Sequence, residues 1–461
     1  MCGVFGIIGK DCEAGKLTYF GLYALQHRGQ ESAGIAVLDE KGIIHYHKGM
    51  GLVPQVFTEN ILQGLPGNTA IGHVRYSTTG ASQIKNAQPI NVRLPDDSTA
   101  MLAHNGNLVN TAELRAELEE NGVSLQMSSD SEIIAALLTK HYNGDLVRTL
   151  TEIAPKLKGA FSLVLLTKNK IIGMRDPHGI RPLCFGRLAN NNGYVIASES
   201  CALDITGATL EREVHKGEIV TLEIDEVKSF IYDGMKTDAL CIFEFVYFAR
   251  PDSIINGRNV YKVREKFGEL LFREHPVDAD VVIPVPDSGM PAAIGFAKSS
   301  GIPYEAGLIK NRYVGRTFIN PSQIMREIGV RLKLNPLPEV LAGRKVVLID
   351  DSIVRGTTSA KLVKLLRDNG AKEIHFRVSC PPSVSPCYYG IDTATKSQLI
   401  AANYSVEEIR RKLDADSLGY LSQDAMLEAT KLPPKFCLGC FNGCYPADVP
   451  QGDELGLIYK D

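Results

Sequence analysis

The segment 345–369 constrains the fold of this chain more than any other part of its sequence. Lys345–Ile349 has the composition of a buried strand, and two adjacent acids, Asp350 and Asp351, follow it directly. A short loop containing glycine and threonine then leads into a helix expected over Thr358–Asn369. A buried strand joined to a helix is the repeating unit of a parallel sheet, whose ligands bind at the carboxyl ends of the strands. The pattern therefore predicts an α/β domain with a binding site beside the two acids.

The same alternation of strands and helices extends over the second half of the chain. Further strands are expected over Ala279–Val285, Tyr304–Ile309 and Glu373–Ser379, and a helix over Met290–Ser299. The tail from Ser405 to Lys431 is expected to be helical, with Ser405 and Glu408 forming a capping box. We assign this α/β domain, with its tail, to residues 237–461.

Residues 1–236 follow a different pattern. Strands are expected over Gly34–Leu38, Ile43–His47, Ala70–Tyr76, Thr99–His104, Ala160–Leu166, Lys170–Met174 and Gly193–Ala197, and helices over Ala14–Leu25, Thr111–Asn121 and Asp130–His141. Asn110 and Glu113 are expected to pair at the start of the second of these helices. Runs of hairpins separated by groups of helices are typical of layered α+β folds. A length of 461 residues agrees with two or three domains.

Charge and hydropathy narrow the classes of protein to consider. The formal net charge is only −3, so neither a nucleic-acid surface nor a membrane surface is indicated. No apolar run approaches the roughly 20 residues that span a bilayer, and no secretory signal is visible. We therefore expect a cytoplasmic protein. Its 10 cysteines should be reduced thiols, metal ligands or catalysts rather than disulfides.

Cys2 is the first candidate for catalysis. Removal of Met1, which is expected before a small residue, would place a thiol and a free α-amine on Cys2. The α-amine titrates at about pH 8, so it can act as a general base near neutral pH. An N-terminal nucleophile paired with its own amine is an established way to activate a weak nucleophile. No propeptide is visible before Cys2, so Met1 alone is expected to be removed.

Three other segments carry side chains that suit the binding of an amide-bearing amino acid. Arg75 lies where an expected strand runs into a polar loop, and it is either a surface residue or a bidentate carboxylate binder. Asn105 and Gly106 follow the next strand, where Asn-Gly forms either a turn or an oxyanion hole. Asp130 begins a helix, and its segment either caps that helix or supplies a carboxylate for a substrate ammonium.

Together these segments resemble the N-terminal-nucleophile glutamine amidotransferases. The matching stretches are Cys2–Gly6, Gln26–Gly29, Arg75–Thr78, His104–Gly106 and Ser129–Glu132. The resemblance implies a four-layer αββα sandwich in which Cys2 is the nucleophile. It assigns Arg75 to the α-carboxylate of glutamine and Asp130 to its α-ammonium. Asn105 and the Gly106 N–H would stabilise the oxyanion, and loss of one such donor typically lowers turnover by about 10²–10³.

The second half carries groups suited to a sugar phosphate. Backbone N–H groups at the start of the helix after the acid pair form a natural phosphate site, to which Thr357 and Thr358 add hydroxyls. The turn Pro284–Gly289 follows the first strand and allows close approach of a ligand. The segment 310–333 is strongly basic, and it is either a solvated loop or one that closes over a polyanion. Its basic residues are Lys310, Arg312, Arg316, Arg326, Arg331 and Lys333.

These motifs resemble the type I phosphoribosyltransferases, which use phosphoribosyl pyrophosphate (PRPP). The resemblance implies an α/β domain with a parallel sheet and contacts to Mg²⁺ from Ser288, Asp350 and Asp351. The residues that it assigns to PRPP are Asp350, Asp351, Arg355, Gly356, Thr357, Thr358 and Lys310.

Both halves together resemble the glutamine-dependent amidophosphoribosyltransferase family. The resemblance implies that ammonia released at Cys2 passes through an internal channel and displaces pyrophosphate from PRPP. The products would be glutamate, 5-phosphoribosylamine and pyrophosphate, in the first committed step of purine synthesis. It also implies a pentosyl transferase that forms homotetramers and is inhibited by purine nucleotides. The alternatives are another amidotransferase of the same glutaminase class and a catalytically silent nucleotide-binding regulator with a phosphoribosyltransferase fold.

Four cysteines form a candidate metal centre. Cys437 and Cys440 are a C-x-x-C pair, and Cys241 and Cys387 are two further candidates. Four thiolates suit either a tetrahedral zinc or an iron–sulfur cluster, and their spacing does not decide between the two. Similarity to the iron–sulfur branch of the family implies a [4Fe-4S] cluster that ties the tail to the core. Cys380 and Cys444 are rival ligands, and the cysteines expected to be structural are Cys12, Cys184 and Cys201.

Overall fold

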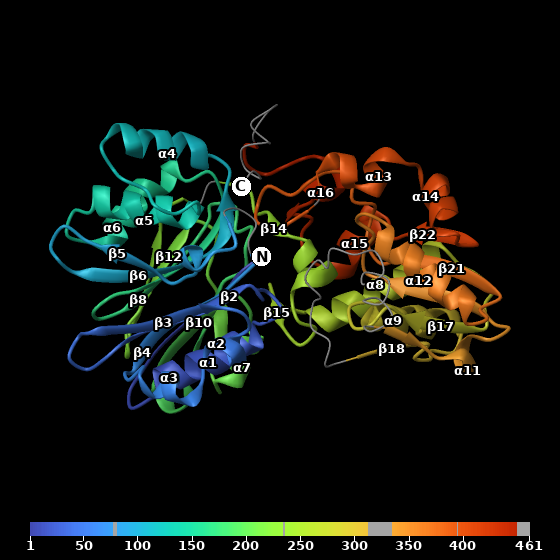
Figure 1. Cartoon of the computed structure of the whole chain (residues 1–461), viewed down its shortest axis with the longest axis horizontal. Coiled ribbons are helices and arrows are strands. Elements are labelled where there is room, and N and C mark those ends of the chain that lie inside the picture. The colour runs from blue at the N-terminus through green and yellow to red at the C-terminus, as the bar shows by residue number, and fades with distance from the viewer. Residues whose placement is uncertain (77–80, 234–235, 312–333, 394, 450–461) are drawn as a thin grey trace.

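The computed structural model describes residues 1–76, 81–233, 236–311, 334–393 and 395–449. Figure 1 shows two halves side by side, with the N-terminal half on the left and the C-terminal half on the right. Most of the predicted basic loop lies outside the described residues. So do Ser77 and Thr78 of the predicted arginine motif.

The N-terminal half contains two antiparallel sheets. The first has the order β11 (Thr209–Glu213), β9 (Cys184–Arg187), β10 (Gly193–Ala197), β1 (Gly3–Gly9), β4 (Thr69–Arg75), β2 (Ser32–Leu38) and β3 (Ile44–Met50). The second has the order β13 (Val227–Ile231), β12 (Glu218–Leu222), β8 (Ile171–Arg175), β7 (Gly159–Leu166), β6 (Thr99–Leu108) and β5 (Ile90–Arg93). Successive side chains of β1 alternate between two cores: Phe5 and Ile7 face one, and Val4 and Ile8 the other.

Helices cover the outer face of each sheet (Figure 1). Those on the first sheet are α1 (Ala14–Ala24), α2 (Val53–Val56), α3 (Glu59–Gln63) and α7 (Cys201–Ile205). Those on the second are α4 (Thr111–Glu120), α5 (Asp130–His141) and α6 (Leu146–Ile153). A third apolar core, which includes Ile71 and Val164, fills the space between the sheets. The predicted αββα sandwich is confirmed.

The C-terminal half is built on a parallel sheet. Its strands, in spatial order, are β17 (Val281–Pro284), β20 (Lys345–Asp350), β21 (Glu373–Val378) and β22 (Ser417–Tyr420). Its main helices are α8 (Val260–Glu274), α9 (Met290–Ser300), α12 (Thr357–Asp368), α14 (Val406–Leu413) and α15 (Gln423–Thr430). The predicted α/β domain with a parallel sheet is confirmed.

Two local predictions in the C-terminal half were wrong. The tail 405–431 is not continuously helical, because Asp414 ends α14 with φ of 58° and β22 then pairs with β21. Only the last two residues of the expected strand Tyr304–Ile309 belong to β18 (Leu308–Lys310), which pairs with β19 (Leu334–Pro336). The capping box of Ser405 and Glu408 is confirmed.

One predicted helix cap in the N-terminal half was also wrong. Asn110 precedes α4 but makes no side-chain capping hydrogen bond. Its Nδ2 instead donates to the Lys156 carbonyl at 3.0 Å, and its Oδ1 accepts from the Lys158 N–H at 3.2 Å. The side chain therefore joins two loops rather than closing the helix end.

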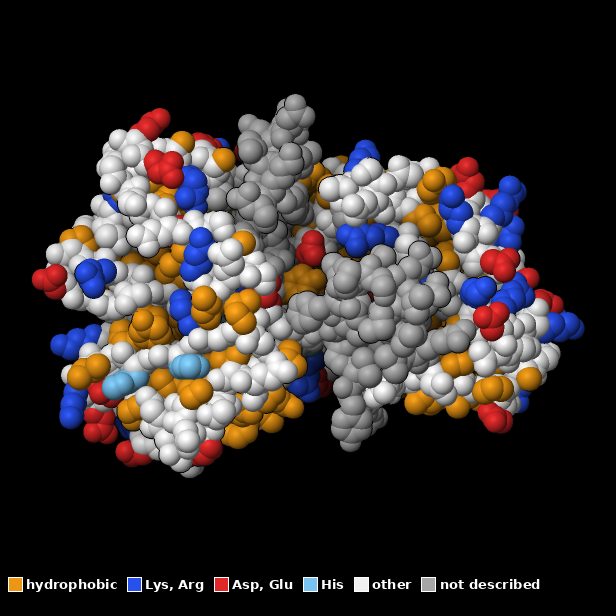
Figure 2. Space-filling model, in the orientation of Figure 1, with side chains coloured by type: hydrophobic (Ala, Val, Ile, Leu, Met, Phe, Trp, Pro, Cys, Tyr) orange, Lys and Arg blue, Asp and Glu red, His pale blue; other side chains and the backbone are white. Residues whose placement is uncertain are grey.

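Surface and boundary features complete the fold. On the face shown in Figure 2, acidic and basic side chains of the described residues are interspersed over both halves. Within the described ranges, no helix has the length and apolar character required to cross a bilayer. The predicted boundary at residues 236–237 falls between β13 and β14 (Leu240–Cys241), and it remains a prediction.

Candidate functional site

Cys2 lies directly before β1, beside the end of β4 and beside β6. Its N–H donates to Asn105 Oδ1 at 3.3 Å, and its Sγ donates to the Tyr76 carbonyl at 3.6 Å. Arg28 Nε donates to the Cys2 carbonyl at 3.0 Å. Met1 is buried in this chain. Contacts from three separate segments thus fix the backbone and the thiol of Cys2 in place.

An unused donor stands beside the thiol. Asn105 is fully buried on β6, and its Nδ2 has no hydrogen-bond partner among the described residues. The next residue, Gly106, packs so closely on β7 that a Cβ would lie 2.0 Å from the Ala160 carbonyl oxygen. Buried donors are normally satisfied, so an amide left open at this point is suited to a substrate oxygen.

Asp130 provides a buried negative charge at the start of α5. Its Oδ2 accepts from the Leu108 N–H at 3.1 Å, and its Oδ1 lies 3.6 Å from His104 Nδ1. Burial alone would raise the pKa of Asp130, but the nearby His104 and the backbone N–H groups hold it below its ordinary value. The carboxylate is therefore ionised at neutral pH and is suited to an ammonium group.

Arg75 ends β4, where it is paired with an acid. Its Nη1 donates to Glu31 and, at 3.3 Å, to the Ala81 carbonyl. The Arg75 side chain is 4% exposed. The structure thus brings Cys2 and Asn105 into contact with each other, and it places Arg75 directly before Tyr76, whose carbonyl accepts from the Cys2 thiol.

A buried ionic network supports Cys2 and was not predicted. Arg28 contacts Glu199 at 2.5 Å and Glu244 at 2.8 Å, and all three side chains are fully buried. Glu244 belongs to the C-terminal half, so the network also joins the two halves. The motif Gln26–Gly29 was recognised, but nothing local in the sequence connects its arginine to acids 171 and 216 residues away.

The second site lies at the carboxyl end of β20. Asp350 and Asp351 are 8% and 5% exposed, and the Asp351 N–H donates to Asp350 Oδ1 at 2.9 Å. Burial and the charge of Asp351 raise the pKa of Asp350 well above its ordinary value. Burial also raises the pKa of Asp351, against the opposing effects of Ser288 and Arg264. Two buried acids held this close together are suited to a cation.

The neighbouring turn and helix complete the shape of this site. Gly289 approaches β20 so closely that a Cβ would lie 2.5 Å from the Ile349 carbonyl oxygen. The helix α12 begins after Gly356, with no side-chain cap, and Thr357 and Thr358 are exposed at its N-terminus. Open backbone N–H groups at such a terminus attract anions.

Two basic residues flank the second site on its open side. Arg355 is exposed in the loop before α12. Lys310, at the end of β18, forms an exposed ion pair with Asp287 at 2.5 Å. Arg264 of α8 was not predicted, although it is buried and lies close enough to Asp351 to lower the pKa of that acid. Buried residues of α8 recur at three- and four-residue spacing. This pattern in the sequence could have indicated that Arg264 lies on the buried face of a helix.

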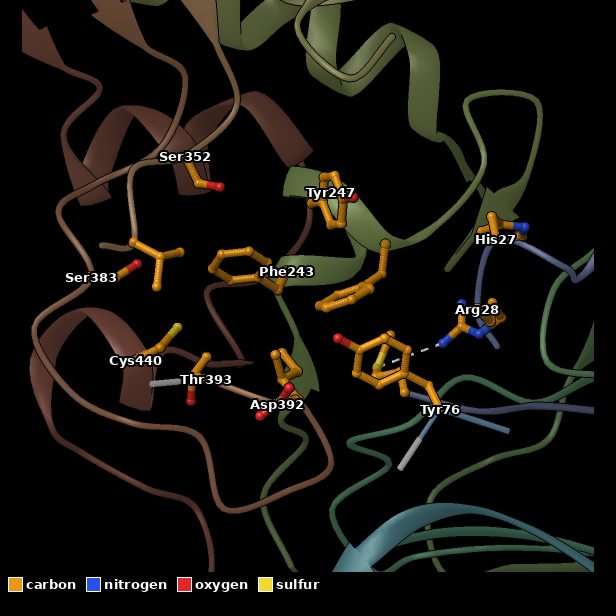
Figure 3. Close-up of a pocket in the computed structure, with 14 residues that line it drawn as sticks. His27, Arg28, Tyr76, Phe243, Tyr247, Ser352, Ser383, Asp392, Thr393 and Cys440 are labelled. Carbon is orange, nitrogen blue, oxygen red and sulfur yellow. Dashed lines mark hydrogen bonds between the residues drawn. The ribbon is translucent and has the colours of Figure 1, made fainter. Parts of the chain in front are cut away.

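A cavity of about 250 Å³ extends between the two sites (Figure 3). Tyr76 and Arg28 line it at the end nearest Cys2, and Ser352 lines it beside Asp351. Figure 3 shows the rings of Phe243 and Tyr247 between these ends. The cavity thus lies between residues next to the Cys2 thiol and a residue next to the acid pair, along a partly aromatic wall.

The predicted cluster cysteines gather where the tail meets the core. Cys241 and Cys437 face each other across the parallel strands β14 and β23 (Phe436–Cys437). Burial and the neighbouring thiols, which include Cys241, Cys387 and Cys437, raise the pKa of Cys440 well above its ordinary value. Within the described part of the chain, no set of three or more potential ligands is arranged to hold a metal ion.

Of the two rival cysteines, Cys444 lies apart from this group, whereas Cys380 is close enough to Cys440 to contribute to its raised pKa. Cys444 is exposed, and its Sγ lies 3.9 Å from the Asn442 carbonyl. Cys380 is buried near Asp350 and Asp351, whose charges add to the effect of burial in raising its pKa.

Two known protein families match this chain, one in each half. A family model described as a glutamine amidotransferase domain matches residues 73–204, and one described as a phosphoribosyl transferase domain matches residues 253–398. The chain is 53% identical over 457 residues to an amidophosphoribosyltransferase of Synechococcus elongatus, covering 98% of this chain and 92% of the relative. It is 50% identical over 474 residues to that of Methanocaldococcus jannaschii, covering 99% and 100%.

Solved structures show the same relationship. The glutamine PRPP amidotransferase of Bacillus subtilis, described in complex with ADP and GMP, superposes with a TM-score of 0.92 at 46% identity. That match covers 98% of each chain. A structure described as the allosteric regulatory enzyme of purine biosynthesis also gives a TM-score of 0.92, covering 98% of this chain and 97% of the other.

Proposed function

This chain belongs to the amidophosphoribosyltransferase family, and we propose that its two sites act in sequence on glutamine and PRPP. Members of this family are glutamine-dependent pentosyl transferases of the first step in purine synthesis, and both domains needed for that reaction are present. The observation that carries the proposed sequence of events is the cavity between the two sites, which is lined by Tyr76 near Cys2 and by Ser352 next to Asp351.

In the first step, Cys2 Sγ attacks the carboxamide carbon of glutamine. Once Met1 is removed, the α-amine of Cys2 accepts the thiol proton and later donates it to the departing ammonia. Asn105 Nδ2 and the Gly106 N–H stabilise the oxyanion. The role of Asn105 is supported by its Nδ2, which has no hydrogen-bond partner among the described residues. Water then hydrolyses the thioester to glutamate.

The two ends of the glutamine backbone are held by opposite charges. Asp130 binds the α-ammonium, because the pKa of its carboxyl lies below the ordinary value and the group is ionised. Arg75 binds the α-carboxylate, and for this it must share its guanidinium with Glu31 or release that partner.

In the second step, ammonia attacks C1 of PRPP and pyrophosphate leaves. Asp350, Asp351 and Ser288 would hold the Mg²⁺ that the phosphoribosyltransferase fold implies. This set fits a hard cation, because two buried carboxylates and a hydroxyl supply oxygen ligands. When bound, Mg²⁺ neutralises charge on the departing pyrophosphate.

The 5′-phosphate of PRPP binds at the N-terminus of α12. Open N–H groups and the hydroxyls of Thr357 and Thr358 supply donors there, and Gly356 allows the turn with φ of 77°. Arg355 is exposed beside this helix end. Lys310 contacts the diphosphate, exchanging its exposed partner Asp287 for the substrate.

Transfer of ammonia through the cavity makes a direct test possible. Glutamine labelled with ¹⁵N in its amide is supplied with PRPP and an equal concentration of unlabelled ammonium. We expect nearly all of the phosphoribosylamine, trapped and analysed by mass spectrometry, to carry ¹⁵N. A product whose label instead follows the ratio of the two sources in bulk solution would contradict internal transfer. Failure to form pyrophosphate from PRPP with either nitrogen source would contradict the assigned reaction itself.

We propose a [4Fe-4S] cluster on Cys241, Cys387, Cys437 and Cys440, following the similarity to the iron–sulfur branch of the family. Cys241 and Cys437 lie opposite each other, and the thiols of Cys241, Cys387 and Cys437 are close enough to Cys440 to raise its pKa. The cluster would hold the tail strand β23 against β14.

Iron and acid-labile sulfide analysis tests this assignment. Protein purified without oxygen should contain about four of each per chain. Cys437→Ala should lose most of both and unfold at lower temperature, because the tail is no longer tied to the core. Cys444→Ala is the matched control, since its thiol is exposed, and it should retain full iron. Full iron in Cys437→Ala, or one zinc per chain in the unaltered protein, would refute the cluster.

Regulation, assembly and location follow from the same family membership. The Bacillus subtilis relative was solved with ADP and GMP, and purine nucleotides are correspondingly proposed as inhibitors of this chain. A homotetramer is proposed on family grounds. A cytoplasmic location is proposed because a catalytic thiol and cluster ligands need a reducing compartment.

A further inference from the structure

The segment Cys387–Ile391 of the transferase half is held by side chains of the glutaminase half. Asn107 Nδ2 donates to the Tyr388 carbonyl at 2.9 Å, and Arg181 Nε donates to the Tyr389 carbonyl at 2.8 Å. All four residues are buried. Because buried carbonyls need partners, these hydrogen bonds fix where the segment lies relative to β6.

Gly390 brings the same segment into direct contact with the candidate oxyanion hole. A Cβ built on Gly390 would lie 3.1 Å from both the carbonyl carbon and the carbonyl oxygen of Gly106. Gly390 has φ of +103°, a conformation that other residues rarely adopt. Glycine thus allows two backbones from different domains to touch at the residue that follows Asn105.

We propose that the segment Tyr388–Gly390 is a positioning element for the glutaminase oxyanion hole. It packs against the Gly106–Asn107 peptide through Gly390, directly after the proposed N–H donor of Gly106, and it holds Asn107 through the Tyr388 carbonyl. Oxyanion donors act only when they lie about 2.7–3.1 Å from the oxygen that becomes charged, so a small shift of this peptide lowers turnover. The inference rests on the proposed role of Cys2.

A shift of the oxyanion donors should lower kcat more than it changes the KM for glutamine. The groups proposed to bind glutamine, Arg75 and Asp130, belong to β4 and α5, where Arg75 contacts Glu31 and the Ala81 carbonyl and Asp130 accepts from the Leu108 N–H. Displacing the oxyanion donors should therefore weaken the transition state while leaving the ground state largely unchanged.

Two variants test the proposal by different routes. Gly390→Ala adds a methyl group against Gly106, and Asn107→Asp replaces the donor to the Tyr388 carbonyl with an acceptor of the same shape. Each should lower kcat with glutamine by roughly tenfold or more, with little change in the KM for glutamine. Pyrophosphate release with free ammonia should stay within about twofold of the unaltered protein, which also shows that the transferase half is folded.

An aldehyde analogue of glutamine provides a readout independent of turnover. Its aldehyde carbon bonds to Cys2 Sγ while the thiol proton moves to the oxygen, giving a tetrahedral adduct that uses the oxyanion hole. Its affinity should fall by the same factor as kcat/KM in both variants. Gly144→Ala is the matched control, because Gly144 has φ of +92° but open space around its Cβ position, and it should behave as the unaltered protein.

The outcomes separate this inference from the function on which it rests. Equal losses with glutamine and ammonia, a rise in KM alone, or no loss in either variant would overturn the positioning role. An unaltered protein that releases no ammonia from glutamine would instead overturn the glutaminase assignment.

Discussion

Replacing Cys2 with alanine should reduce glutamine-dependent pyrophosphate release to background and leave ammonia-dependent release intact. The thiol is the proposed nucleophile, and Cys2 is the residue that contacts both Asn105 and the Tyr76 carbonyl. The second site, which contains Asp350 and Asp351, is separate from Cys2, so ammonia supplied in solution should still react there. The measurement is pyrophosphate formed from PRPP with each nitrogen source in turn.

One control variant and two contrary outcomes make the test specific to Cys2. Cys201→Ala is the matched control, because Cys201 is a buried thiol of the same half without a proposed catalytic role, and it should retain both activities. Glutamine-driven turnover in Cys2→Ala would show that the nucleophile is another group. Mass spectrometry of fully active protein that still carries Met1 would exclude the α-amine of Cys2 as the base.

Features encoded by neighbouring residues were predictable from the sequence. Asp350 and Asp351 were placed correctly at the sheet edge because a buried strand runs directly into them. The capping box of Ser405 and Glu408 formed for the same reason, since both partners lie within one turn. The tail strand β22 was missed because it is set by pairing with β21, about 40 residues earlier in sequence, and not by its own composition.

Contacts between distant segments could not be predicted. Arg28 meets Glu244 at a separation of 216 residues, and Asn107 meets Tyr388 at 281. A buried charge is tolerated only with a partner, so Arg28 implied that acids would be near, but not which ones. The cavity could not be predicted from the sequence either, because its walls combine residues from both halves. The cluster ligands, the Mg²⁺ ligands and the roles at both sites remain predictions.

Asp350→Asn should abolish pyrophosphate release with either nitrogen source, by at least roughly 100-fold. The substitution keeps the shape of the side chain, and the new amide oxygen can still accept from the Asp351 N–H. It removes one of the two charges proposed to hold the cation of Mg²⁺–PRPP. Burial and the charge of Asp351 raise the pKa of Asp350, which means that a negative charge on Asp350 is unfavourable when no ligand is bound. The variant should therefore fold at least as stably as the unaltered protein while losing activity.

The combination of lost activity and retained stability distinguishes a binding site from a structural acid. Thermal unfolding and the steady-state rates with glutamine and with ammonia are measured on the same preparation. Asp368→Asn, at the exposed end of α12, changes the same charge away from the site and should leave both rates unchanged. If Asp350→Asn lost only the glutamine reaction, the acid pair would have to act on ammonia supply and not on PRPP. Because Cys2→Ala should lose only the glutamine reaction and Asp350→Asn should lose both, a division of the chemistry between two sites requires different patterns in these two variants.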